Sequence, residues 1–234
     1  MAARYGNALV LITEDPDSKW DILARRARKF GWWNATGQLG TMVFVRLGKL
    51  ALQSRIRRYI AQQRLEVELP RSCDVVKVPS VNSEAFVRAV SDLQPDLIFL
   101  AGCRVMTKAT LSRMPCPVVN YHAGVTPKYR GMNGGYWALA SGEPDQFGST
   151  IHIVDEGIDT GPILEQTRCL PEPGDSIITY PYTLAAASRA ACVKVVEGML
   201  AGHIDALPGV GQSRQWYHPP IWQYLWTGLS ARAW

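Results

Sequence analysis

Two short stretches of the chain carry side chains that could act together in one reaction. Asn120 and His122 stand one residue apart at the end of an apolar, β-branched run, which predicts a buried strand. Side chains two residues apart in a strand point to the same face, so both could enter one cavity at the carboxyl end of that strand. Open α/β sheets bind their ligands at this end. Asp159 lies in a loop flanked by glycines, which could bring a carboxylate to the same cavity.

The chemistry that suits these side chains is acyl transfer through a tetrahedral intermediate. The Asn120 amide and a protonated His122 would stabilise the developing oxyanion. Asp159 would orient the imidazolium, raise its pKa so that it stays cationic into the neutral range, and manage protons through a water molecule. Residues 118–131 contain no Ser or Cys, so the attacking group would belong to the substrate. One Asn-x-His at a strand end is usually structural, and the two loops that accompany it favour the functional interpretation.

Longer motifs surround these residues: NYH at 120–122, TPKYRG at 126–131 and HIVDEGIDTGPI at 152–163. With them the chain resembles the formyltransferases that use 10-formyltetrahydrofolate. That family includes glycinamide ribonucleotide, methionyl-tRNA and sugar-nucleotide N-formyltransferases. Many members follow the histidine with Pro-Ser or Gly-Ser, whereas this chain has Ala123-Gly124. Together with the Tyr-Arg-Gly of the loop, this departure makes the chain look more like the sugar-nucleotide branch.

The resemblance implies which residues hold each substrate. Asn120, His122 and Asp159 would be the catalytic residues, and no metal is expected. The donor 10-formyltetrahydrofolate would be held by two segments: Gly102, Cys103, Arg104, Val105, Met106, Asp155, Glu156 and Gly157. The acceptor would contact Thr126, Lys128, Tyr129, Arg130, Gly131, Asn133, Gln212 and Tyr217. The loop after the first strand should lie on the substrate side, which adds Asn7 and residues 13–15 as candidates.

The function that the resemblance implies is transfer of a formyl group to the amine of a nucleotide-linked amino sugar, such as dTDP-4-amino-4,6-dideoxyglucose. Glycinamide ribonucleotide formylation and formyltetrahydrofolate hydrolysis are alternatives. A non-catalytic module that binds anions or a membrane surface is a third. A tRNA acceptor is not expected, because the tail has only Arg214 and Arg232 as basic residues.

Composition agrees with a folded protein of ordinary type. The chain has 234 residues, of which 47% are hydrophobic and 19% charged, and a net charge of +5 that favours an anionic partner. Its five cysteines form no CxxC pair, so neither a disulfide framework nor a zinc site is indicated and a cytoplasmic location is expected. No apolar run reaches the roughly 18 residues that a membrane span needs, and no signal peptide is evident.

Apolar runs that alternate with amphipathic segments predict an α/β fold: a Rossmann-like, doubly wound and mostly parallel sheet. We expect a catalytic domain over residues 1–204 that contains a basic insert at 32–65. The insert could lie on a membrane or an acidic partner, pack on the sheet with solvated arginines, or meet a substrate pyrophosphate. Residues 205–234 form a proline-broken tail with many aromatic residues, which suggests a subunit interface, as in a homodimer, or a lid on the substrate.

Overall fold

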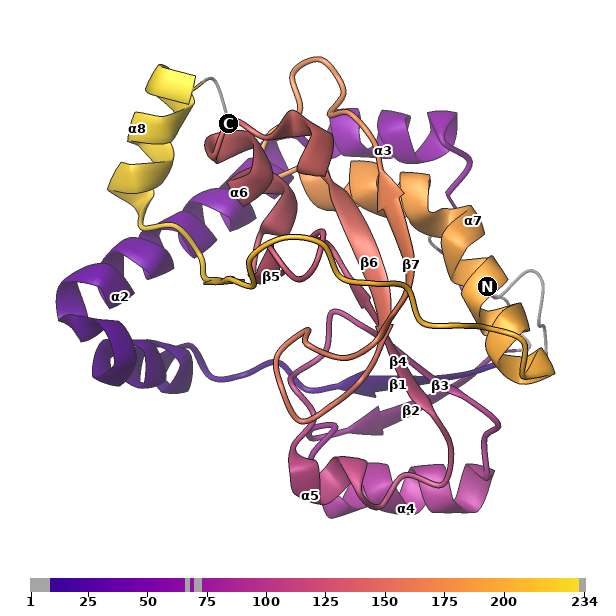
Figure 1. Ribbon diagram of the computed structural model, residues 1–234. Coiled ribbons are helices and arrows are strands. Elements are labelled where there is room, and N and C mark those ends of the chain that lie inside the picture. Colours follow the sequence, from indigo (N-terminus) through magenta and orange to yellow (C-terminus); the bar gives the residue numbers. More distant parts are fainter. Residues whose placement is uncertain (1–8, 66–67, 70–72, 232–234) are drawn as a thin grey trace.

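The protein is described here from a computed structural model, which covers residues 9–65, 68–69 and 73–231, so that Asn7 lies outside the described residues. Two groups of strands form its centre (Figure 1). β1 (Val10–Glu14) and β2 (Asp74–Val78) pair in parallel. A four-stranded sheet follows in the order β3 (Ile98–Ala101), β4 (Val118–His122), β6 (Gly148–Ile153) and β7 (Ile163–Arg168).

The direction of the strands refines the predicted sheet. β3 and β4 run parallel, whereas β6 is antiparallel to β4 and β7 is antiparallel to β6. The α/β, Rossmann-like class is confirmed, but the four-stranded sheet is mixed. β6 and β7 are joined directly by the loop of residues 154–162, and neighbouring strands joined by a short loop run antiparallel.

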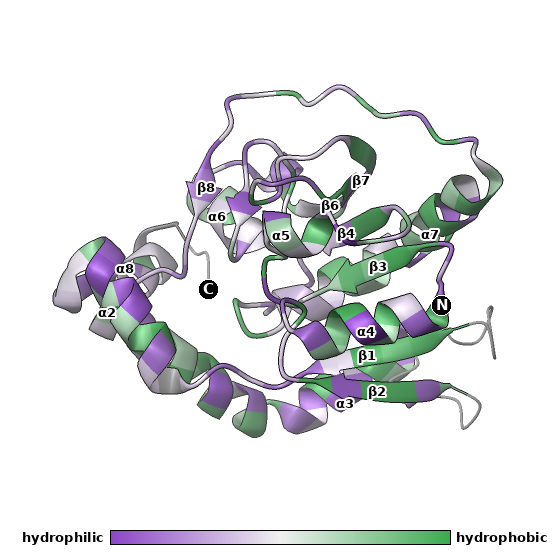
Figure 2. Ribbon diagram, turned by 90° about the horizontal axis from the view of Figure 1, so that it is seen from below, coloured by the Kyte–Doolittle hydropathy of each residue, from purple (hydrophilic) through white to green (hydrophobic). Residues whose placement is uncertain are grey.

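Helices bury both groups of strands. α4 (Glu84–Leu93) begins at Ser83, whose hydroxyl accepts a hydrogen bond from Phe86 N–H, and it packs its apolar face against β2 and β3. α7 (Tyr180–Ala201) places Val195 in a cluster with buried side chains of β4, β6 and β7. Figure 2 shows apolar residues concentrated along β1, β3 and β4, although the side chains of β1 are only half-buried. Short α5 (Lys108–Leu111) lies between β3 and β4 in the chain.

The helix after β1 is sharply bent. α2 (Lys19–Ala51) contains Gly31, whose φ of 78° and ψ of 157° are not helical and are accessible essentially to glycine alone. Leu23 and Ala27 before this bend form a buried cluster with Ala35 after it. The bend at Gly31 thus separates the first part of the helix from the basic insert that was expected to begin at residue 32.

The basic insert comprises the second half of α2 and all of α3 (Gln53–Gln62). Ile56 is buried in the main core, as a helix packed on the rest of the protein requires. However, Trp32, Leu47 and Leu50 are exposed. Packing of the insert is therefore observed, and a membrane or partner role for its exposed face stays a prediction.

The tail is more ordered than the sequence suggested. β8 (Gln215–Trp216) pairs in parallel with β5 (Arg130–Gly131), and α8 (Ile221–Ala231) packs on α2. Trp216 stacks on Trp137 of α6 (Gly134–Ala140) with ring centroids 4.5 Å apart, and α6 leads into a single 3-10 turn, η2 (Pro144–Gln146). Several of the tail's aromatic side chains therefore pack within the chain, and its role as a lid or subunit interface remains a prediction.

The bend in α2 makes a testable prediction. Gly31→Ala should destabilise the protein by about 1–3 kcal/mol, because alanine is strained at this backbone conformation although no atom would clash with its methyl group. Urea unfolding would measure the change. Arg28→Ala, at an exposed helical position of the same helix, is the control and should change stability by less than about 0.5 kcal/mol. Equal stabilities of the two variants would contradict the strain at Gly31.

Candidate active site

The carboxylate of Asp159 is the centre of the site. Its Oδ1 accepts a hydrogen bond from Asn120 Nδ2 at 3.2 Å, and its Oδ2 accepts one from the backbone N–H of Gly131 at 2.8 Å. Oδ2 also lies 3.3 Å from Nδ1 of His122, and Oδ1 lies 3.3 Å from Nε2 of His152. The structure thus brings Asn120, His122 and Asp159 together, as the sequence predicted.

His152 also belongs to this group, as a buried and hydrogen-bonded residue. It lies directly opposite Asn120 across the antiparallel β4–β6 pair, and opposite residues of such a pair share one face of the sheet. Its Nε2 is 3.2 Å from Asn120 Nδ2, and its Nδ1 donates to the carbonyl of Ile153 at 2.8 Å. The sequence shows His152 only as the first residue of the motif at 152–163, and its pairing partner depends on the register of two strands.

His122 is held by a contact on each ring nitrogen. Its Nε2 lies 2.7 Å from the carbonyl oxygen of Tyr129, which can only accept, so Nε2 carries a proton. Its Nδ1 faces Asp159. A second proton on the ring therefore belongs at Nδ1, between the imidazole and the carboxylate.

The predicted pKa of His122 requires a correction. Burial holds the pKa of His122 below its ordinary value, and the opposing charge of Asp159 does not outweigh that burial. The expectation that His122 stays cationic into the neutral range is therefore wrong. Burial also acts to raise the pKa of Asp159, but the hydrogen bond with His152, the charge of His122 and the Gly131 N–H together hold it below its usual value.

The residues expected on the acceptor side divide into two groups. Gly131 contacts Asp159 directly, Arg130 donates to the carbonyl of Ile158 at 2.7 Å and to Ser213 Oγ at 2.9 Å, and Asn133 Nδ2 lies 2.8 Å from Nδ1 of His218. These three lie around the loop that carries Asp159 or beside the tail.

Thr126, Lys128 and Tyr129 differ from the expectation. Thr126 is buried, and so is Tyr129, whose hydroxyl donates to Glu143 at 2.8 Å. Lys128 is bound to the same carboxylate at 2.6 Å. The side chains of Lys128 and Tyr129 therefore support the loop through Glu143, whereas the buried Thr126 hydroxyl has no hydrogen-bond partner among the described residues.

From the tail, Tyr217 is half-buried and its hydroxyl accepts a hydrogen bond from Lys29 at 2.7 Å. Gln212 is exposed.

The two segments expected to hold the donor meet in space. Glu156 forms an ion pair with Lys108 at 2.7 Å, which joins the 155–157 segment to the chain after β3. Asp155 Oδ1 accepts hydrogen bonds from Gly157 N–H at 3.0 Å and from Thr160 Oγ1 at 2.7 Å, which shape the loop. Val105 is exposed by 55%, whereas Met106 is buried with Cys103 and Val154 packed nearby.

Gly102 adopts a φ of 67°, where glycine is favoured, at the start of this loop. Burial raises the pKa of the Cys103 thiol to about 11, so Cys103 is a small packing residue rather than a reactive thiolate.

Arg104 makes its contacts within the chain. Its backbone N–H donates to Glu14 Oε1 at 2.6 Å, and its guanidinium binds Glu14 and Asp17. Glu14 also accepts the N–H of Val81 at 3.1 Å. Residues 13–15 were expected on the substrate side, and Glu14 instead holds the loop of residues 102–106. An acidic residue at the end of the first strand was the only signal for this role.

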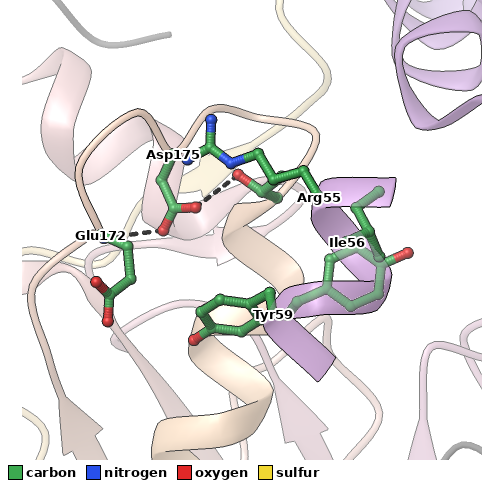
Figure 3. Close-up of a pocket in the computed structure, with 7 residues that line it drawn as sticks. Arg55, Ile56, Tyr59, Glu172 and Asp175 are labelled. Carbon is green, nitrogen blue, oxygen red and sulfur yellow. Dashed lines mark hydrogen bonds between the residues drawn. The ribbon is translucent and has the colours of Figure 1, made fainter. Parts of the chain in front are cut away.

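A separate pocket lies against α3 and the start of α7 (Figure 3). Arg55, Tyr59, Glu172 and Asp175 line it, and Arg55 donates to the carbonyl of Pro173 at 2.9 Å. None of the predicted site residues lines this pocket. Within the part of the chain that the structure describes, no group of His, Cys, Asp and Glu side chains is arranged to hold a metal ion.

Comparison of the sequence with known proteins identifies the family of the chain. The model of the formyl transferase family matches residues 37–196, more than half of the chain. The chain belongs to that family. A methionyl-tRNA formyltransferase of Desulfotalea psychrophila is 33% identical over 133 residues, which is 56% of this chain and 41% of that protein. A second, from Pelobacter propionicus, is 28% identical over 61% of this chain and 45% of that protein. The chain thus spans less than half the length of these curated relatives.

Solved structures of the family share the fold of the chain. The phosphoribosylglycinamide formyltransferase of Anaplasma phagocytophilum has a TM-score of 0.52 at 19% identity, over 62% of this chain and 75% of that one. The formyltransferase PseJ of Anoxybacillus kamchatkensis, in complex with UDP-4,6-dideoxy-4-formamido-L-AltNAc and tetrahydrofolate, has a TM-score of 0.51 at 18% identity. That match covers 74% of this chain and 85% of PseJ.

None of the helices among the described residues combines the length and apolar composition that crossing a bilayer requires.

The histidines predict how stability depends on pH. Burial, with the charge of Arg26, lowers the pKa of His218 to about 4, and burial also lowers that of His122. The unfolded chain, in which histidine has a pKa of about 6.5, then binds more protons than the folded chain below neutrality. Stability should therefore be full above pH of about 6.5 and fall as pH decreases toward 4, with His218 contributing at most about 3 kcal/mol.

Thermal unfolding between pH 4 and 8 would measure this dependence. His218→Gln should make the unfolding temperature fall less steeply between pH 6.5 and 4, because the variant has no ring to protonate there. His203→Gln, at an exposed position, should leave this fall unchanged. If the unfolding temperature falls equally steeply with decreasing pH in His218→Gln and the native chain, the assignment of this pH dependence to His218 is contradicted.

Proposed function

We propose that this protein transfers a formyl group from 10-formyltetrahydrofolate to the amino group of a nucleotide-linked amino sugar. The observation that carries the proposal is the convergence of donors on the Asp159 carboxylate. Asn120 Nδ2 and the Gly131 N–H donate to it, and ring nitrogens of His122 and His152 lie beside it. This convergence holds Asn120, His122 and Asp159 in one fixed arrangement. An amide there could hydrogen-bond a carbonyl oxygen, and an imidazole beside a carboxylate could take up a proton.

The same group explains how the reaction would proceed without a protein nucleophile. The groups that meet at Asp159 contain no serine or cysteine, so the acceptor amine itself would attack the formyl carbon. Neutral His122 has a free lone pair at Nδ1, facing Asp159, where it could take up a proton released by the amine. Asp159 would stabilise the imidazolium that this transfer creates.

The donor fits the loop after β3. A flat pterin ring needs an apolar surface, and this loop presents the exposed side chain of Val105 beside the buried cluster that contains Met106 and on which Cys103 and Val154 pack. Glu14 holds this loop through Arg104, and the ion pair of Lys108 with Glu156 joins it to the loop that carries Asp159. The donor would thus lie between two segments that are both connected to the catalytic group.

The related proteins point to two candidate acceptors. PseJ was solved with a UDP-linked formamido sugar and matches 85% of its own length to this chain, which supports a nucleotide sugar such as dTDP-4-amino-4,6-dideoxyglucose. The curated relatives are named methionyl-tRNA formyltransferases, so charged initiator tRNA is the second candidate acceptor.

The catalytic roles can be tested by substitution. Asn120→Ala and His122→Ala should each lower the turnover of the best acceptor about a hundredfold or more, as removal of an oxyanion donor or of a general base does in other enzymes. Release of tetrahydrofolate would be followed with saturating donor. His203→Ala is a matched control at an exposed position and should keep native turnover. Circular dichroism would establish that all three variants are folded, and near-native turnover in either active-site variant would refute the assignment.

The choice of acceptor needs a direct comparison. Release of tetrahydrofolate should require an amino-sugar nucleotide, saturate with its concentration and change little between 50 and 200 mM salt. A tRNA acceptor would instead show a steep salt dependence, because its binding neutralises many phosphates. The same assay is carried out with glycinamide ribonucleotide as the acceptor and without any amine. Turnover only with charged tRNA, only with glycinamide ribonucleotide or without an amine would each replace the proposed acceptor.

A further inference from the structure

Arg26 is a partly buried cation without an acidic partner among the described residues. Its Nη1 lies 3.1 Å from the sulfur of Met42, and its Nη2 lies 4.0 Å from the sulfur of Met132. Thioether sulfur is a weak acceptor, so the guanidinium keeps most of its capacity to donate. Its neighbour Arg25 shows the usual arrangement, since it is paired with Asp17 at 2.5 Å. A half-desolvated guanidinium that lacks such a carboxylate is suited to an anion from outside.

The groups beside Arg26 are also donors. His218 Nδ1 accepts a hydrogen bond from the amide of Asn133, so the proton of the neutral ring lies on Nε2, for which no partner exists among the described residues. Lys29, one turn after Arg26, donates to the Tyr217 hydroxyl and places its ammonium 4.7 Å from the centre of that ring. Among the described residues neither Arg26 nor Lys29 forms an ion pair with a carboxylate, and residues 22–65 contain neither Asp nor Glu.

This group is connected to the catalytic carboxylate through three consecutive residues. Gly131 donates to Asp159, Met132 contacts Arg26, and Asn133 holds His218. The bend at Gly31 allows the arrangement, since Arg26 before the bend reaches Met42 after it. The segment that carries Tyr217 and His218 is fixed in turn by Trp137, whose Nε1 donates to the carbonyl of Tyr217 at 2.8 Å.

We propose that Arg26, with Lys29 and the Nε2–H of His218, forms the site for the diphosphate of the acceptor. The two cations match the charge of a diphosphate, and the planar guanidinium can donate to two of its oxygens at once. The short connection from Met132 to Gly131 places this site beside the group around Asp159. The assignment rests on the proposed function for the identity of the acceptor, but the anion site itself can be tested without it.

Binding of inorganic pyrophosphate by isothermal titration calorimetry tests the site directly. The native chain should bind it saturably, and Arg26→Gln should weaken binding at least tenfold because one of the two cations is lost. Arg28→Gln removes the same charge at an exposed position of the same helix and should bind like the native chain. Arg26→Lys keeps the charge without the planar pair of donors and should bind with intermediate strength.

Kinetics with the best acceptor give the second measurement. Arg26→Gln should raise the acceptor KM at least tenfold and leave the KM for 10-formyltetrahydrofolate unchanged. Absence of pyrophosphate binding, or equal weakening in Arg26→Gln and Arg28→Gln, would overturn the site. If no acceptor is turned over by the native chain but pyrophosphate binding still depends on Arg26, the proposed function fails and the anion site stands. Thermal unfolding of each variant would separate lost binding from lost folding.

Discussion

A buried carboxylate sets the main constraint on this structure. Removing an ionised group from water is costly, and the cost is tolerable only when hydrogen-bond donors and cationic groups replace the water. Asp159 meets this condition through donors from three places in the chain: β4, the turn that begins at Gly131, and β6. Its own backbone adopts a φ of 51°, an uncommon conformation that turns its side chain back toward the sheet. One side chain thus contacts both paired strands β4 and β6 and connects the loop of residues 154–162 to the segment at Gly131.

The state of His122 is a balance between burial and this carboxylate. Burial favours the neutral ring and the nearby negative charge favours the cation, and burial is the larger influence. The Tyr129 carbonyl removes any ambiguity about the tautomer, because it requires the proton to be on Nε2. A ring with this arrangement is neutral at rest and accepts its second proton beside Asp159. Such a group suits a reaction in which an amine must lose a proton as it attacks.

The periphery of the site depends on elements far apart in the chain. Glu14 at the end of β1 secures residues 102–106 through Arg104, and the tail adds β8 beside β5. α2 approaches the same turn only because Gly31 lets the helix reverse its course and bury Ala35 against its own first half. Substrate contacts would therefore arise from the first helix, the central loop and the tail together, although only the central loop carries the recognisable motifs.

Local pattern in the sequence was enough to determine that strands alternate with helices. It also determined that the side chains of Asn120 and His122 lie on the same face of one strand. Strand periodicity fixes which side chains share a face, and glycines mark the loop of Asp159, so these features need only neighbouring residues. Tertiary structure alone decided that His152 lies opposite Asn120, because this depends on the antiparallel register of β4 and β6. It also decided the pKa of His122, which depends on how completely the surrounding chain excludes water. Likewise, the partners of Arg104 depend on how segments far apart in the sequence pack together, and so does the lack of an acidic partner for Arg26 among the described residues. Short-range pattern does not encode this packing.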